Sequence, residues 1–176
     1  ELRLCGALLI ASIFNGMGYV YFSLKEEFKK NKMMYLYYIL YLMCALIFGK
    51  LYTAYAYAGL SVWNAGLSAY GGLIGVIVAS FVFEKIIPQN GRLLDASILS
   101  LPLVYGISKL ACFVGGCCGG FEYEGFMSVR YPHVMDIPQF PVQLLETIVS
   151  LVVFGICFML RKKKGIRYIT LILTAT

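Results

Sequence analysis

Long apolar runs dominate the pattern of hydrophobic and polar positions in this chain. A membrane-crossing helix needs about 20 mostly apolar residues. Five runs approach that length, and a sixth begins near Tyr168; the five are Leu4–Leu24, Met33–Tyr57, Leu67–Phe83, Ala96–Val114 and Val142–Leu160. The third and fourth runs are short, so we expect them to lie between other helices. The pattern predicts an all-α, polytopic membrane bundle.

Composition agrees with a membrane location. Hydrophobic residues make up 60% of the chain and charged residues 14%, and the mean hydropathy is +0.79. These values exclude an ordinary soluble globule. At 176 residues the chain has room for one membrane domain, 1–176. Because it begins at Glu1 without a methionine and stops at Thr176 inside an apolar run, we expect further sequence at the ends.

The net charge of +6 is distributed as an orientation signal. Basic residues follow the first, third and fifth runs, whereas the two intervening connections contain only Arg130. Cytoplasmic loops carry an excess of Lys and Arg. The charge pattern therefore predicts an N-terminus outside the cell and gives no support to nucleic-acid binding.

Tyrosines crowd the inner end of the second run, at positions 35, 37, 38 and 41. Tyr and Trp are enriched where membrane helices meet the headgroups. We therefore expect these four side chains to form an interfacial belt.

Rare polar side chains gather at one depth, near the outer ends of four predicted crossings. They are Lys50, Tyr70, Lys109, Cys112, Cys117, Cys118 and Glu146. Taken singly, Lys50 can extend its ammonium to the interface, and Glu146 suits a helix N-terminus. Together they are typical of a functional site, since ionisable groups in a membrane are costly. Two lysines and one carboxylate predict a site for an anionic headgroup.

Glycines accompany these polar residues in two segments, Gly66–Gly75 and Gly115–Gly120. The spacing of Gly71 and Gly75 is that of close helix packing. The glycines on both sides of Cys117 and Cys118 suggest instead a loop whose exposed amides bind an anion.

The outer cysteines leave several chemistries open. Cys112 has the spacing to pair with Cys117 or Cys118 in a disulfide if that side is oxidising. We expect no metal and no other cofactor, because the chain has no C-x-x-C pair and His133 is its single histidine.

With these residues laid out, the chain resembles the bacterial prolipoprotein diacylglyceryl transferase family, as a divergent member with a Gly-Cys-Cys loop. The resemblance runs in order through most of the chain, in the segments Gly66–Gly75, Asp95–Gly106, Ser108–Gly116 and Phe140–Glu146. At the family's motif histidine, arginine and asparagine this chain has Tyr70, Lys109 and Cys112, and Cys117 replaces an acidic residue.

The resemblance implies transfer of a diacylglyceryl group from phosphatidylglycerol to a thiol, at a site on the outer leaflet of the bacterial plasma membrane. The acceptor would be a peptide or a small molecule. The implied catalytic residues are Tyr70, Lys109, Cys112, Cys117, Cys118 and Glu146. The implied substrate-binding residues are Lys50, Gly71, Gly72, Gly116, Arg130, His133 and Gln143.

Three other functions remain open at the sequence level. Cys117 or Cys118 can act as a nucleophile for acyl transfer, with His133 as base. The loss of the family histidine and arginine favours a non-catalytic subunit that binds lipid or peptide. A thiol oxidoreductase would pair the three outer cysteines reversibly.

Overall fold

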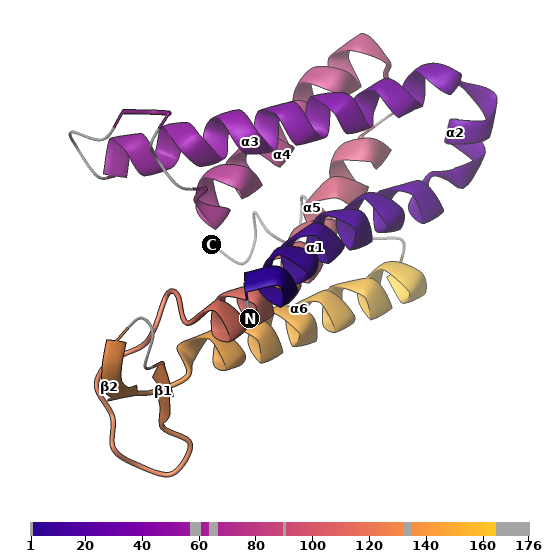
Figure 1. Cartoon of the computed structure of the whole chain (residues 1–176). Coiled ribbons are helices and arrows are strands. Elements are labelled where there is room, and N and C mark those ends of the chain that lie inside the picture. Colours follow the sequence, from indigo (N-terminus) through magenta and orange to yellow (C-terminus); the bar gives the residue numbers. More distant parts are fainter. Residues whose placement is uncertain (1, 57–60, 64–66, 90, 132–134, 165–176) are drawn as a thin grey trace. The chain divides into compact units, whose positions relative to one another are not determined.

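The computed structural model describes residues 2–56, 61–63, 67–89, 91–131 and 135–164. Figure 1 shows its elements in chain order. They are α1 (Leu2–Ser23), α2 (Lys25–Lys30), the 3-10 turn η1 (Lys32–Tyr35), α3 (Leu36–Ala56), α4 (Ala69–Ile86), α5 (Arg92–Gly115), β1 (Val129–Tyr131), β2 (Met135–Gln139) and α6 (Val142–Lys164).

The described part of the chain contains five helical stretches long and apolar enough to cross a membrane. They are Leu4–Ser23, Lys32–Ala56, Ala69–Ile86, Arg92–Gly115 and Val142–Arg161. The predicted helical membrane fold with five crossings is therefore confirmed. The sixth crossing, expected near Tyr168, lies outside the described residues, and the outward N-terminus stays a prediction.

The fourth crossing is longer than the sequence suggested. We expected a short helix from Ala96, but α5 begins at Arg92 and has 24 residues. The start is set by Gly91, whose φ of +78° turns the chain and whose carbonyl accepts from the Asp95 amide at 3.0 Å. An acidic residue is favourable in a first helical turn, so Asp95 belongs to the helix and does not precede it.

The helices form two compact units. The first, called the hairpin unit, comprises residues 1–16 and 102–164; the second, called the tyrosine unit, contains residues 17–101. One boundary falls inside α5 at Pro102, where proline removes a backbone hydrogen bond and favours a bend.

The tyrosine unit is built around a buried hydroxyl. Tyr37 on α3 is 0% exposed, and its Oη lies 2.9 Å from Ser80 Oγ on α4 and 2.7 Å from Ser97 Oγ on α5. Tyr41 is also buried, whereas Tyr35 is half exposed. The predicted interfacial belt is thus wrong for Tyr37 and Tyr41. Tyrosine tolerates burial when its hydroxyl finds partners.

Helices α3 and α4 approach closely at glycines. A Cβ at Gly75 would lie 2.6 Å from the Cys44 carbonyl carbon, and one at Gly71 would lie 2.7 Å from Tyr52 Cβ. Gly72 has more room, because a Cβ there would meet only the Ala45 carbonyl oxygen, at 3.8 Å. The spacing of Gly71 and Gly75 therefore serves helix packing.

The hairpin unit adds a small sheet that the sequence did not suggest. Strand β1 pairs with β2 in antiparallel register, Val129 opposite Gln139 and Tyr131 opposite Met135. Helix α6 starts directly after Pro141, and its Thr147 Oγ1 donates to the Gly106 carbonyl of α5 at 3.0 Å. These contacts fix α6 against α5, where the polar residues lie.

Candidate functional site

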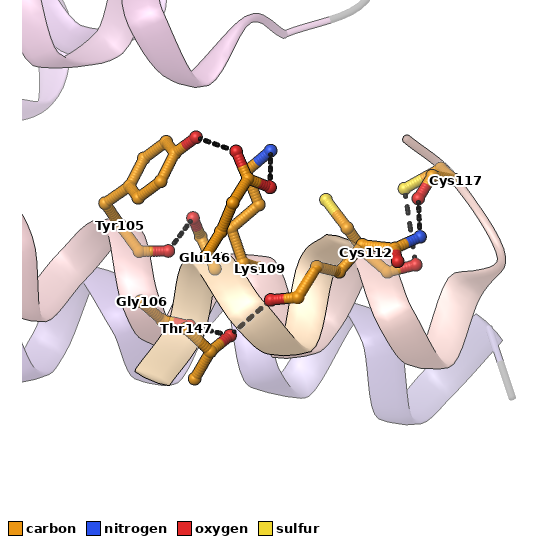
Figure 2. Close-up of polar contacts among 9 residues, drawn as sticks. Tyr105, Gly106, Lys109, Cys112, Cys117, Glu146 and Thr147 are labelled. Atoms are coloured by element: carbon orange, nitrogen blue, oxygen red, sulfur yellow. Dashed lines mark hydrogen bonds and ion pairs between the residues drawn. The ribbon is translucent and has the colours of Figure 1, made fainter. Parts of the chain in front are cut away.

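The candidate site is an ion pair between α5 and α6, held by a tyrosine. Lys109 Nζ lies 2.7 Å from Glu146 Oε2, and Tyr105 Oη donates to Glu146 Oε1 at 2.8 Å. Figure 2 shows both contacts on the same carboxylate. Tyr105 and Lys109 are four residues apart, so they share one face of α5.

Burial makes this ion pair unlike a surface pair. The Lys109 side chain is 10% exposed and that of Glu146 is 27% exposed. The ammonium also lies 5.1 Å from the centroid of the Tyr105 ring. A buried charge needs both a counter-charge and hydrogen bonds. Glu146 and Tyr105 together supply them, and they fix the ammonium in place.

The end of α5 brings two of the cysteines together. Gly116, with φ +68°, follows the last helical residue, and its amide donates to the Phe113 carbonyl at 3.4 Å. The Cys117 amide donates to the Cys112 carbonyl at 3.0 Å. This pair of bonds is the Schellman ending, which places the second residue after the helix cap over the last turn. Cys117 therefore returns to Cys112 (Figure 2).

Cys118 completes a cluster of thiols. The Sγ atoms of Cys112, Cys117 and Cys118 all lie within 4.8 Å of one another. No disulfide joins Cys112 to Cys117 or Cys118 in the structure, so the pairing that the sequence left open is not formed. Cys117 and Cys118 are exposed and Cys112 is half-buried.

The Cys117 thiol is not activated by its surroundings. Desolvation raises its pKa above the ordinary value, a hydrogen bond with Cys112 opposes that change, and Cys118 reinforces it. A raised pKa means that less of the nucleophilic thiolate is present at neutral pH. This argues against Cys117 alone as a nucleophile.

Gln143 links the ion pair to the cysteine loop. It lies one turn before Glu146 on α6, is 0% exposed, and donates from Nε2 to the Cys117 carbonyl at 2.8 Å. Its Oε1 has no donor among the described residues. A buried acceptor without a donor is costly, so this oxygen favours a ligand that carries an N–H, O–H or S–H group.

The glycines of the loop pack against the end of β2 and the start of α6. A Cβ at Gly119 would overlap the Gln139 side chain, and one at Gly120 would lie 2.6 Å from Val142 Cγ2. Close packing therefore accounts for these two glycines, and the predicted anion-binding loop stays a prediction.

Four predicted site residues belong to the tyrosine unit. Lys50 donates to the Trp63 carbonyl at 3.2 Å, and Tyr70 is 55% exposed, with its ring centroid 6.3 Å from that of Tyr52. Gly71 packs against α3, and Gly72 lies next to it. That these residues converge with Lys109 stays a prediction.

Arg130 and His133 are the last two of the predicted site residues. Arg130 is exposed on β1, whereas His133 lies outside the described residues. No role was predicted for Tyr105 or Thr147. The available signal was their helical spacing: Tyr105 precedes Lys109 by four residues, and Thr147 follows Gln143 by four.

The sequence matches a family model described as prolipoprotein diacylglyceryl transferase over residues 1–175. The chain belongs to the prolipoprotein diacylglyceryl transferase family. It is therefore a multi-pass membrane protein of that family, and the resemblance in the sequence motifs is confirmed.

Curated relatives carry the name phosphatidylglycerol–prolipoprotein diacylglyceryl transferase. The protein of Tolumonas auensis is 31% identical over 111 residues, which cover 62% of this chain and 43% of that protein. The protein of Chloroherpeton thalassium is 24% identical over 165 residues, covering 86% and 58%. A third, from Francisella tularensis subsp. mediasiatica, is 29% identical over 112 residues, covering 62% and 42%. The chain thus spans about two-fifths to three-fifths of the length of these family members.

Proposed function

We propose that this protein transfers a diacylglyceryl group from phosphatidylglycerol to a cysteine thiol at the outer leaflet of a bacterial plasma membrane. Family membership and the names of its relatives support the reaction class. The observation that carries the proposal is the fixed, nearly buried ammonium of Lys109 beside Glu146. It stands where the family has its motif arginine.

The reaction changes the charge next to that ammonium. The acceptor sulfur forms a bond to the terminal glyceryl carbon as the carbon–oxygen bond to phosphate breaks. The oxygen keeps the electron pair, so a phosphodiester with one negative charge becomes glycerol phosphate with up to two. A cation held at the phosphate stabilises the transition state more than the bound substrate. Lys109 has that role in the proposal.

Glu146 and Tyr105 act as positioning residues. A lysine lacks the planar fork with which arginine grips a phosphate. Because Glu146 occupies one ammonium donor and Tyr105 holds the carboxylate, the remaining Lys109 donors point in fixed directions. Preorganisation of this kind compensates for the loss of the fork.

The other proposed contacts follow the chemistry of each group. Arg130, exposed on β1, offers positive charge to the headgroup. Gln143 Oε1 accepts from the acceptor thiol or its peptide amide.

The test measures release of glycerol phosphate from phosphatidylglycerol labelled in its headgroup. The purified full chain is incubated with a cysteine peptide or with the matched serine peptide. We expect release that requires the thiol and that falls about 100-fold in Lys109→Met. The matched control is Lys85→Met, which removes an exposed lysine on α4 that lies over the Phe81 ring.

A companion variant separates charge from folding. Lys109→Met combined with Glu146→Gln leaves no unpaired buried charge, so it should fold and remain inactive. Release that persists in this double variant would contradict the proposed role of Lys109. Phospholipid that co-purifies without any release would instead favour the non-catalytic binding subunit, for which the neutralising Glu146 is the supporting observation.

A further inference from the structure

The thiol cluster of Cys112, Cys117 and Cys118 has more members than a disulfide or a single nucleophile requires. The Schellman ending of α5 explains why Cys112 and Cys117 lie close together. It does not explain Cys118, whose φ of +55° is uncommon for a residue with a side chain. A disulfide would use two sulfur atoms, but three lie within 4.8 Å of one another.

We propose that Cys112, Cys117 and Cys118 bind one Zn²⁺ ion, whose fourth position takes the thiol of the acceptor substrate. Zinc bound to sulfur has metal–sulfur distances of about 2.3 Å in a tetrahedral arrangement, which puts neighbouring sulfur atoms about 3.8 Å apart. Sulfur atoms already within 4.8 Å need only small side-chain rotations to reach that spacing. Soft thiolate ligands also select zinc over the hard cations.

Exposure favours an open site over a closed structural one. Structural zinc is enclosed by four protein ligands, whereas catalytic zinc keeps one position for water or substrate. The described residues supply three cysteine ligands, and two of them, Cys117 and Cys118, are exposed. A fourth ligand can therefore arrive from outside the protein.

The electrostatic surroundings suit a cluster rich in thiolates. Three cysteine thiolates on Zn²⁺ carry one net negative charge, and a bound substrate thiolate adds another. Lys109 lies one helical turn before Cys112 on α5. Its ammonium offsets part of the charge, so the cluster is less costly to form at the end of a membrane helix.

The chemical role rests on the proposed transferase function. A thiol that coordinates zinc loses its proton, which passes to water. The sulfur then attacks the glyceryl carbon, the carbon–oxygen bond breaks, and glycerol phosphate leaves with the electron pair. The thioether product is neutral and a weaker zinc ligand than the thiolate, so it departs. Coordination to zinc thus supplies the thiolate that the transfer requires.

The first test measures the metal without reference to activity. The full chain, purified in detergent under reducing conditions, is loaded with Zn²⁺ and freed of excess metal. We expect about one zinc per chain by elemental analysis. Cys112→Ala, Cys117→Ala and Cys118→Ala should each weaken binding by more than the roughly 10-fold to 100-fold that loss of an outer-shell partner costs. Cys157→Ala, which removes a thiol from within α6, should bind zinc normally.

The second test probes the open position with Co²⁺ as a coloured substitute. A cysteine peptide should change the thiolate-to-cobalt absorption, and the matched serine peptide should not. Absence of stoichiometric zinc, or a disulfide among the three thiols as the sole product under the same conditions, would overturn the proposal. Stoichiometric Cu⁺ in place of Zn²⁺ would also overturn it, because a three-coordinate ion leaves no position for the substrate.

The two proposals fail in different ways. Full release of glycerol phosphate by metal-free protein would overturn the zinc role and leave the transferase intact. Zinc that binds the thiol peptide, with no release from any phospholipid, would overturn the transferase and leave the metal site standing.

Discussion

At the scale of single residues, the site depends on how one lysine is held. Lys109 is a point charge without the planar fork of an arginine, and Glu146 and Tyr105 limit where its ammonium can point. The same pairing lowers the net charge available to a phosphate. A positioned cation of this kind favours the transition state, in which negative charge grows, over tight binding of the substrate.

The ion pair should contribute measurably to stability. In a double-mutant cycle with Lys109→Met and Glu146→Gln, we expect a coupling free energy of about 1–3 kcal/mol, because each single variant leaves a nearly buried partner unpaired. The measurement is the free energy of unfolding in detergent micelles. The exposed pair Lys29–Glu26, at 3.3 Å, is the control and should show less than about 0.5 kcal/mol. Equal coupling in both pairs would contradict the burial argument.

At the scale of elements, helix packing and helix ends decide where the chemistry lies. Helix α4 lies against α3 through glycines, and α5 ends in a turn that returns its cysteines to the last helical residues. The loop that follows packs Gly119 against the end of β2 and Gly120 against the start of α6. Glycines thus allow close packing both between α3 and α4 and in the loop after α5.

Two glycines three residues apart on α4 make a matched comparison. Gly75→Ala should lower the free energy of unfolding by about 1–3 kcal/mol, because its Cβ would overlap the Cys44 carbonyl of α3. Gly72→Ala has ordinary space and should be neutral or stabilising by up to about 1 kcal/mol. Thermal or denaturant unfolding of both variants measures the difference. Similar values would show that α3 and α4 do not pack as described.

At the scale of the whole molecule, the described residues include five apolar helices with basic residues in alternate connections, as in a multi-pass protein. The positive-inside rule predicts that the connection with Lys30 is cytoplasmic and that the one with Glu122 faces outward. In a cysteine-free background, an impermeant maleimide should label Glu122→Cys in intact cells. It should label Lys30→Cys only after the membrane is opened. The reverse pattern would contradict the outward site.

The sequence predicted those features that depend on local pattern. Apolar run length located all five crossings, and shared depth brought together Lys109 and Glu146, which the structure joins in an ion pair. The burial of Tyr37 was not predicted. The hydroxyls of Ser80 and Ser97, which form hydrogen bonds with Tyr37, lie 43 and 60 residues away in the chain. No local rule links such distant partners.

Two further features, the two-stranded sheet and the arrangement of the outer cysteines, also depend on more than the local sequence pattern. Strands β1 and β2 have only 3 and 5 residues, and Pro138 interrupts the second, so their alternation is too short to recognise. The convergence of Cys112, Cys117 and Cys118 depends on the backbone turn at Gly116. Sequence spacing had suggested pairing among these three cysteines, whereas the absence of a C-x-x-C pair gave no reason to expect a metal site.

The mass of the acceptor peptide tests the central claim most directly. Purified protein is incubated with phosphatidylglycerol and a cysteine peptide, and the peptide is then analysed by mass spectrometry before and after treatment with hydroxylamine. The proposed reaction predicts addition of one diacylglyceryl group through a thioether, which hydroxylamine leaves in place. An acyl group that hydroxylamine removes, or an unmodified peptide beside protein that still holds phospholipid, would contradict it.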